Sequence, residues 1–239
     1  MKLEMFIKED YQYPSYSDRD YGSQSYDRLD LPTLELNRLL KNDCKEYFSL
    51  IGNKTPLFRG EYRIKTKIAK AYTHNNRRPS GTASQLFSIF NLWLSKSGHL
   101  SRSLNIVIAT SSYKIANDFG NPYYVFPIGS IEYSWIEAKD VNLPDKRTGW
   151  SVMTIPKFFG KLNTDAILNP NKFNPIGNEQ LKSYNIPLKK PFEDYFHTNE
   201  GFDRAYSNEY EIWFKCNSYY IVSARWFVWS KNQLWYKAQ

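Results

Sequence analysis

The spacing of hydrophobic residues in the first part of the chain predicts helices. Between residues 31 and 51 these residues recur at helical intervals, at Leu36, Leu39, Leu40, Tyr47, Phe48 and Ile51. Pro32 is tolerated in a first helical turn, and Gly52 stands where glycine commonly ends a helix. We therefore expect a helix over 31–51. A second amphipathic helix is expected over about 83–96, and residues 64–72 are also expected to be helical, with a loop over 73–82.

From residue 104 onward the pattern changes to that of strands. Short runs rich in β-branched and aromatic residues are bounded by turn-forming residues, which predicts strands. With one earlier candidate, the expected strands are 57–60, 104–109, 123–128, 131–136, 152–155, 210–215, 219–229 and 233–236. Helices precede strands along the chain, so the order predicts an α+β fold and disfavours an alternating α/β fold.

Two segments follow neither period. Residues 9–30 are rich in Tyr, Ser and Asp, and we expect a mobile or surface-draped arm that takes up residues 1–30. Residues 156–208 are rich in Asn, Pro, Lys and Gly, and this segment is long for a loop without short helices of its own. We expect residues 31–239 to form a single domain in which 156–208 is a long variable insert.

The composition narrows the class of protein. The chain has 239 residues, of which 41% are hydrophobic and 17% aromatic, enough for one sizeable core and too many for a disordered chain. No stretch approaches 18 apolar residues, and the N-terminus lacks the apolar core of a signal peptide. We therefore expect a cytoplasmic protein without a membrane partner. Cys44, Cys216 and three scattered histidines show no metal-ligand spacing, which disfavours a zinc site or a disulfide scaffold.

The charge is unevenly distributed. The net charge is +8, yet residues 62–117 contain nine Lys and Arg residues and no Asp or Glu. One interpretation is a solvated face with a chance gap in acidic residues. The other is a surface that receives a polyanion, either the pyrophosphate of a cofactor or a nucleic acid.

Two short motifs end apolar strands. The first is Phe58-Arg59-Gly60, whose arginine has the simple alternative of a charge carried into solvent at a strand end. The second is Thr110-Ser111-Ser112, which follows the apolar run 106–109. Its simple alternative is a helix N-cap, because Ser and Thr accept hydrogen bonds from the first turn. Its functional interpretation is a hydroxyl that helps to hold a polar ligand.

The third motif is a pair of acidic residues two positions apart. Glu209 and Glu211 flank Tyr210, and in a strand both carboxylates would project from the same face, with Tyr210 and Ile212 pointing to the core. Like charges side by side repel, so structure alone gives no reason to pair them. Such a pair can place one carboxylate against a sugar and the other against a nucleophile. The alternative is a plain solvent-facing strand edge.

In this order, the three motifs resemble the R-S-E class of mono-ADP-ribosyltransferases. The segment 116–120 (Ala-Asn-Asp-Phe-Gly) is similar to the one that follows the family's hydroxyl motif, and 125–129 looks like stretches of phage-encoded members. The triplet reads Thr-Ser-Ser where the family usually has Ser-Thr-Ser, so both Thr110 and Ser111 stay open as the key hydroxyl. The resemblance implies a core of two packed, mostly antiparallel sheets with N-terminal helices.

The resemblance also implies a reaction and a role for each residue. The enzyme would cleave NAD at the bond between nicotinamide and ribose and transfer ADP-ribose to an acceptor, with NAD as substrate and no metal. Glu211 would stabilise the oxocarbenium ion, and Glu209 would orient or deprotonate the acceptor. Arg59 would hold a phosphate of NAD. Thr110 or Ser111, next to Ser112, would brace the nicotinamide ribose and the catalytic strand.

The acidic pair and the basic stretch 62–117 favour different acceptors for the ADP-ribose. In the family, Glu-x-Glu is associated with arginine acceptors on proteins, whereas the basic stretch 62–117 favours nucleic acid. If the chain is phage-encoded, it would act in the host cytoplasm. Two rivals are a non-catalytic protein that binds nucleotide or nucleic acid, and a structural or virion protein in which the motifs are accidental.

Overall fold

A computed structural model of the protein describes residues 25–73, 91, 94–95, 97–101, 105–139 and 196–237. These residues form an α+β fold, as the order of the sequence patterns predicts. The helices are α1 (Thr33–Asp43), α2 (Lys45–Ile51), α4 (Tyr113–Asp118) and α8 (Phe202–Ser207). The strands are β1 (Tyr26–Arg28), β2 (Phe58–Glu61), β3 (Ile68–Tyr72), β4 (Ile106–Ala109), β5 (Asn121–Pro127), β6 (Glu132–Ile136), β7 (Phe196–Thr198), β8 (Ile212–Lys215), β9 (Ser218–Ser223), β10 (Phe227–Ser230) and β11 (Gln233–Tyr236). None of the described helices has the length and apolar character needed to span a membrane.

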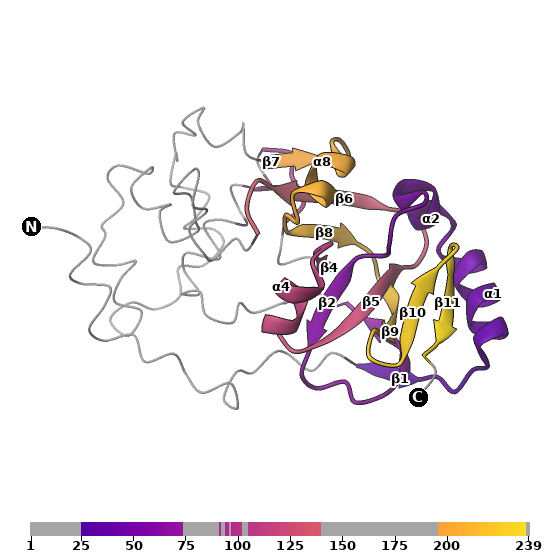
Figure 1. Ribbon diagram of the computed structural model, residues 1–239. Helices are drawn as coiled ribbons and strands as arrows, with labels where there is room; N and C mark the ends of the chain where they lie inside the picture. The colour runs from indigo at the N-terminus through magenta and orange to yellow at the C-terminus, as the bar shows by residue number, and fades with distance from the viewer. Residues whose placement is uncertain are drawn as a thin grey trace, which may run out of the picture.

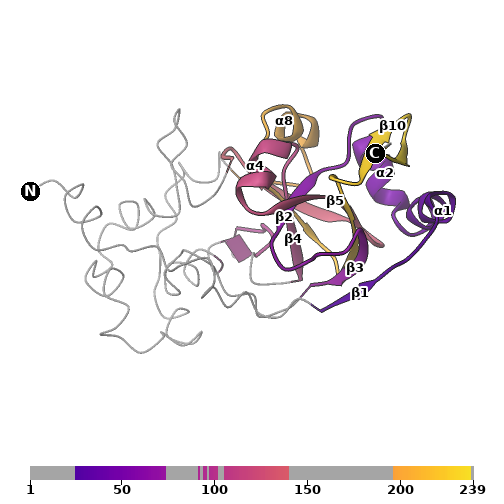
Figure 2. The same ribbon diagram turned by 60° about the horizontal axis from the view of Figure 1, so that its bottom comes forward.

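The strands form two main sheets and a hairpin. One sheet has five strands in the order β1-β3-β9-β5-β2, the other has four in the order β4-β8-β6-β7, and β10 pairs with β11. Every pairing between these strands is antiparallel. Helices α1 and α2 lie together beside the hairpin, on the side away from α4 (Figures 1 and 2). The expected antiparallel sheets and N-terminal helices are therefore present.

The helix predicted over 31–51 forms as two consecutive helices. Residue Cys44 leaves the helical conformation at φ −115°, and Gly52, at φ 57°, ends α2 as predicted. The backbone hydrogen bonds continue through the break, because the Cys44 N–H donates to Leu40 and the Cys44 carbonyl accepts from Phe48. The break turns the chain without leaving these backbone groups unsatisfied.

Tyr47 of α2 joins the two sheets. Its ring meets Phe126 of the five-stranded sheet at 6.1 Å and Phe214 of the four-stranded sheet at 5.7 Å, both edge to face. The fully buried hydroxyl accepts a hydrogen bond from the Leu57 N–H at 2.9 Å. This contact fixes the residue just before β2, so the core directly positions the first motif.

Two predictions of secondary structure are wrong. The expected helix over 64–72 is instead a loop leading into β3, in which Ala69 and Ala71 are buried between β1 and β9. Alanine favours helices, but small side chains also suit a crowded sheet interior, and here the tertiary context decides.

The expected single strand over 219–229 is likewise two strands, β9 and β10, separated by a turn at residues 224–226. The turn lets the hairpin fold back onto α2, where Trp229 stacks on Phe48 at 5.9 Å. The stacking of these two partly buried rings goes with the interruption of an otherwise strand-like sequence.

Other predicted segments lie partly outside the described residues. Of the arm 1–30, residues 1–24 lie outside, and Tyr26–Arg28 forms β1, an exposed edge strand. The insert 156–208 is described only from residue 196, where it contributes β7 and the short helix α8 to the domain. Of the second helix, Asn91, Leu94 and Ser95 are helical. The loop 73–82, apart from Thr73, and the strand 152–155 lie outside the described residues.

Candidate functional site

The three sequence motifs meet where the edges of the two sheets touch. Strand β2 is an edge of the five-stranded sheet, and β4 is an edge of the four-stranded sheet. A single β-bridge joins them, with the Phe58 N–H donating to Thr110 at 2.7 Å and the Thr110 N–H donating to Phe58 at 2.9 Å. Both views place β2, β4 and α4 side by side (Figures 1 and 2). We call this region, residues 58–61, 108–112 and 209–211, the seam.

Arg59 connects the two strands of the seam through its side chain. The guanidinium donates from Nη1 to the Ile108 carbonyl of β4 at 3.1 Å and from Nε to the Glu61 carboxylate. Both charged side chains are largely buried, with 14% and 11% of their surface exposed. The interpretation of Arg59 as a charge released into solvent at a strand end is therefore wrong. Burial raises the pKa of Tyr123 to about 12, and the negative charge of Glu61 adds to this shift.

The hydroxyl triplet holds the chain that leads into the third motif. Thr110 donates from Oγ1 to the Glu209 carbonyl at 3.2 Å, and Ser111 donates from Oγ to the Tyr206 carbonyl at 2.5 Å. Ser112 is the N-cap of α4, because its Oγ accepts from the Ile115 N–H at 3.5 Å. The N-cap interpretation of the triplet thus holds for Ser112, whereas Thr110 and Ser111 brace the turn before β8.

The acidic pair does not lie in a strand, contrary to the sequence prediction. Glu209 has a left-handed backbone at φ 59°, and β8 begins only at Ile212. The reason is that α8 ends in a turn, where the Glu209 N–H donates to Tyr206 and the Tyr210 N–H donates to Ala205. The predicted burial of Tyr210 and Ile212 is correct.

The two carboxylates consequently occupy different environments. The Glu209 side chain is 43% exposed, whereas Glu211 as a residue is only 6% exposed. The Glu211 backbone is held by the end of β6, since its N–H donates to Ala138 at 2.8 Å and its carbonyl accepts from Ile136. The expectation that both acids project from one strand face is therefore wrong, but the difference in burial gives the two groups different chemistry.

The Glu209 carboxylate is surrounded by groups that favour its charged form. Lys139 lies 2.7 Å from it, and a hydrogen bond to this ammonium lowers the pKa of Glu209. Burial opposes the effect, while the charge of Lys139, a hydrogen bond from Ser112 and the charge of Lys114 reinforce it. Glu209 is thus a carboxylate at neutral pH, suited to attracting a cation.

Close packing of α4 fixes the position of the first motif. A Cβ added to Gly60 would lie 2.1 Å from the Ala116 carbonyl oxygen and 2.7 Å from the Phe119 backbone. At Gly120, where φ is +132°, an added Cβ would lie 2.8 Å from the Glu61 backbone. These two glycines let α4 pack directly against β2, so the segment 116–120 is tied to Arg59 and Glu61 by shape.

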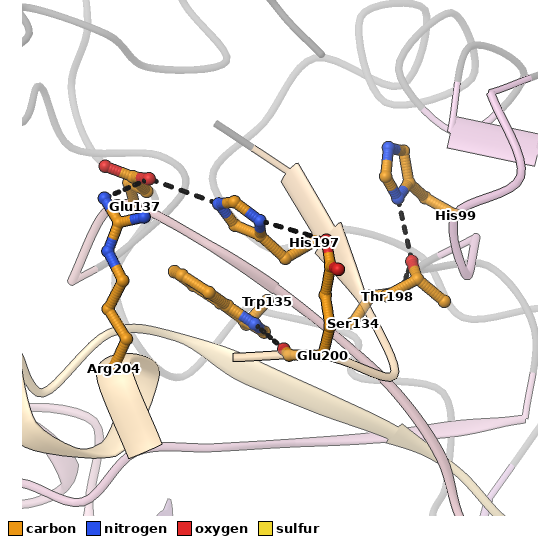
Figure 3. A network of polar contacts seen from close by, with 8 residues as sticks. All are labelled: His99, Ser134, Trp135, Glu137, His197, Thr198, Glu200 and Arg204. Atoms are coloured by element: carbon orange, nitrogen blue, oxygen red, sulfur yellow. Dashed lines mark hydrogen bonds and ion pairs between the residues drawn. The ribbon is translucent and has the colours of Figure 1, made fainter. Parts of the chain in front are cut away.

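A second polar network, which the sequence analysis missed, lies beside the third motif (Figure 3). The Glu137 carboxylate lies between Arg204, at 2.6 Å, and Nε2 of His197, at 3.2 Å. The His197 ring stacks on Trp135 at 3.9 Å, and Trp135 stacks in turn near Tyr210 at 5.7 Å. These stacked rings connect Glu137 and His197 to Tyr210, the residue between Glu209 and Glu211.

The other half of this network joins His99 to strands β6 and β7. His99 Nδ1 lies 2.8 Å from Thr198 Oγ1, which also contacts Ser134 Oγ at 2.7 Å (Figure 3). Burial, helped by the charge of His197, lowers the pKa of His99, although Glu200 opposes the shift. No spacing in the sequence signals this network, because its members come from four separate segments joined only by the fold.

Lys139 is the other residue of the site that the sequence did not indicate. It follows β6 by three positions and lies near Glu209 because Ala138 and Ile136 bind the Glu211 backbone. Among the residues that the structure describes, no group of three or more His, Cys, Asp or Glu side chains could hold a metal ion. The seam brings together the carboxylates of Glu61, Glu209 and Glu211, the hydroxyls of residues 110–112 and the guanidinium of Arg59, with Lys139 beside it.

Comparisons of the chain with protein-family models, with curated proteins and with solved structures gave no match. Functional inference consequently depends on the seam itself.

Proposed function

We propose that the protein is a mono-ADP-ribosyltransferase that cleaves NAD at the bond between nicotinamide and ribose. ADP-ribose would be transferred to an arginine side chain of a protein, with no metal involved. The resemblance of the three motifs to the R-S-E class motivates the proposal.

One observation carries the proposal beyond the sequence. Motifs separated by about 50 and 100 residues are hydrogen-bonded to one another: Phe58 to Thr110, Arg59 to Ile108, and Thr110 to Glu209. Accidental motifs in an unrelated fold would have no reason to share one set of contacts. Their convergence supports a single site built from β2, β4 with the residues after it, and the turn between α8 and β8.

The environments of the two acids suit different steps of such a reaction. As the C1′–N bond of NAD breaks, nicotinamide leaves with the electron pair and the ribose becomes an oxocarbenium ion. The shielded carboxylate of Glu211 would stabilise this cation, since charge interactions strengthen where water is excluded. A guanidinium nitrogen of the acceptor then forms the new bond to C1′ and releases one proton through Glu209 to water.

The roles of the other seam residues follow from their contacts. Thr110 and Ser111 would position the acidic pair by holding the carbonyls of Glu209 and Tyr206. Arg59 would hold a phosphate in exchange for the Glu61 carboxylate, because both are anions that suit the guanidinium fork. NAD binding would then be coupled to the separation of Arg59 from Glu61.

The direct test is release of nicotinamide from NAD by the purified protein, with and without agmatine as a small guanidinium acceptor. We expect slow release in buffer, faster release with agmatine, and a new ADP-ribosylated agmatine product by mass spectrometry. If nicotinamide is released under neither condition, including with whole-cell lysate added as a source of acceptors, the proposal is wrong and the non-catalytic rivals gain support.

One observation favours nucleic acid as a second candidate for the acceptor. Lys67 Nζ lies over the rings of Trp226 and Tyr236 at 4.8 and 4.9 Å, and Arg225 also lies over Trp226. Basic groups interleaved with aromatic rings are typical of single-stranded nucleic-acid surfaces. Digestion of lysate labelled with radioactive NAD separates the two acceptors, since label on protein resists nuclease and label on nucleic acid resists protease.

A further inference from the structure

The carboxylate proposed to receive the acceptor already holds a cation. The Lys139 ammonium lies 2.7 Å from Glu209 Oε2, and the side chains of the two residues are 58% and 43% exposed. Both side chains are thus exposed to solvent, and ion pairs of this kind contribute little to stability. An incoming cation can therefore replace Lys139 at low cost.

The position of Lys139 is set by the same backbone that sets the catalytic acid. The Ala138 carbonyl accepts from the Glu211 N–H at 2.8 Å, so the residue next to Ala138 is fixed relative to the acidic pair. Lys139 is therefore presented to Glu209 by the architecture of the seam. Glu209, for its part, is directed outward by its left-handed backbone at φ 59°.

We propose that Lys139 occupies the acceptor position and acts as an internal competitor of the substrate arginine. The inference rests on the proposed transferase function and adds to it a specificity-determining residue. An acceptor guanidinium displaces the ammonium because its planar fork can engage both carboxylate oxygens, whereas the ammonium is a point charge. Neutral or acidic acceptors have no means of displacing it, so Lys139 selects for guanidinium groups.

The test compares Lys139→Met with wild type in steady-state kinetics, with agmatine as the varied substrate at saturating NAD. Methionine keeps the length of the side chain and removes its charge. We expect the KM for agmatine to fall about two- to fivefold, the fold-change that corresponds to an exposed ion pair. The KM for NAD should change less than the KM for agmatine, because Arg59, and not Lys139, is assigned to the phosphates of NAD.

The chain offers a matched control in Lys215, whose ammonium lies 3.0 Å from Glu132 with 46% and 51% of the two side chains exposed. Lys215→Met removes an equivalent charge without touching the seam and should leave the KM for agmatine as in wild type. Lys139→Arg keeps a cation at this position. Its KM for agmatine should therefore equal or exceed that of wild type. In a Glu209→Gln background, Lys139→Met should have no further effect.

The outcomes separate the inference from the function on which it rests. A KM for agmatine that is unchanged or raised in Lys139→Met, in an enzyme that releases nicotinamide, overturns the role of Lys139 alone. An equal decrease in the KM for agmatine in Lys139→Met and Lys215→Met would show that the effect comes from the net charge of the protein. This result also overturns the role of Lys139. Absence of nicotinamide release from wild type removes the transferase function, and the inference with it.

Discussion

Strand β8 has an exposed lysine–glutamate pair at each end, and the two pairs have different origins. At the far end, Lys215 and Glu132 are direct cross-strand partners in the register of β8 and β6. At the seam, Lys139 and Glu209 lie outside any strand, and Glu209 has a left-handed backbone. The two pairs have similar N–O distances and similar exposed fractions. They differ in the backbone contacts that bring each lysine to its glutamate.

The difference shows which contacts the sheet itself explains. Opposite charges on facing residues support the pairing of strands, and the Lys215–Glu132 pair needs no further reason. A glutamate at positive φ costs about 1–2 kcal/mol, and nothing in the register of β8 requires it. At the seam the conformation is that of a helix end: the Glu209 N–H donates to Tyr206, the Tyr210 N–H donates to Ala205, and Thr110 holds the Glu209 carbonyl.

The largest expected effect is a difference in nicotinamide release between variants of Glu211, at the seam, and of Glu132, at the far end of β8. If the proposed function holds, Glu211→Gln should lower nicotinamide release by about 100-fold or more, because the amide keeps the shape and loses the charge that would stabilise the oxocarbenium ion. Glu132→Gln, at the far end, should stay within about twofold of wild type, since a surface pair contributes little. Turnover of Glu211→Gln above a tenth of wild type would contradict the role of Glu211.

The second prediction tests whether packing at the seam is as tight as its contacts indicate. Gly60→Ala should lower the free energy of unfolding by about 1–3 kcal/mol, measured in urea, because its Cβ would meet backbone atoms of α4 that cannot rotate away. Gly129 is the control, since its added Cβ meets nothing within 4 Å and only its φ of +84° disfavours alanine. Gly129→Ala should cost about 1 kcal/mol. A smaller loss for Gly60→Ala than for Gly129→Ala would mean that α4 moves freely over β2.

The sequence could predict the parts of this site that depend on local pattern. Alternation of apolar residues predicted the burial of Tyr210 and Ile212, and the apolar run before Thr110 predicted β4. The positive φ of Glu209 could not be predicted, because it is imposed by the end of α8 and by Thr110, which lies 99 residues away. The partner of Glu209 was equally hidden, since Lys139 is brought near by the backbone bonds between Glu211 and residues 136 and 138, which lie more than 70 residues earlier.

The third prediction distinguishes the two hydroxyls that the sequence left open. Thr110→Val removes the bond to the Glu209 carbonyl and the acceptor of the Ser112 N–H, in a residue only 6% exposed. The acidic pair would then be held less firmly, and a loss of about 1.4 kcal/mol of transition-state stabilisation lowers nicotinamide release about tenfold, which is the effect we expect. Ser111→Ala, which loses a bond three residues earlier in the turn, should have a smaller effect. The reverse order in the measured rates would make Ser111 the key hydroxyl.

The smallest expected effect concerns His99, which contacts Thr198 of the edge strand β7, in contrast to the two lysine–glutamate pairs near the ends of β8. Burial and the nearby charge of His197 lower the pKa of His99, against the opposing influence of Glu200. The unfolded chain therefore binds a proton near pH 6.5 that the folded protein does not yet bind, so stability falls as the pH drops from there through the folded pKa. Urea unfolding at pH 7.5, 6.5 and 5.5 should show this decrease in wild type. His99→Asn should reduce the slope, and Lys215→Met, at the far end of β8, should keep it. An identical slope in His99→Asn would assign the acid sensitivity of the protein to groups other than His99.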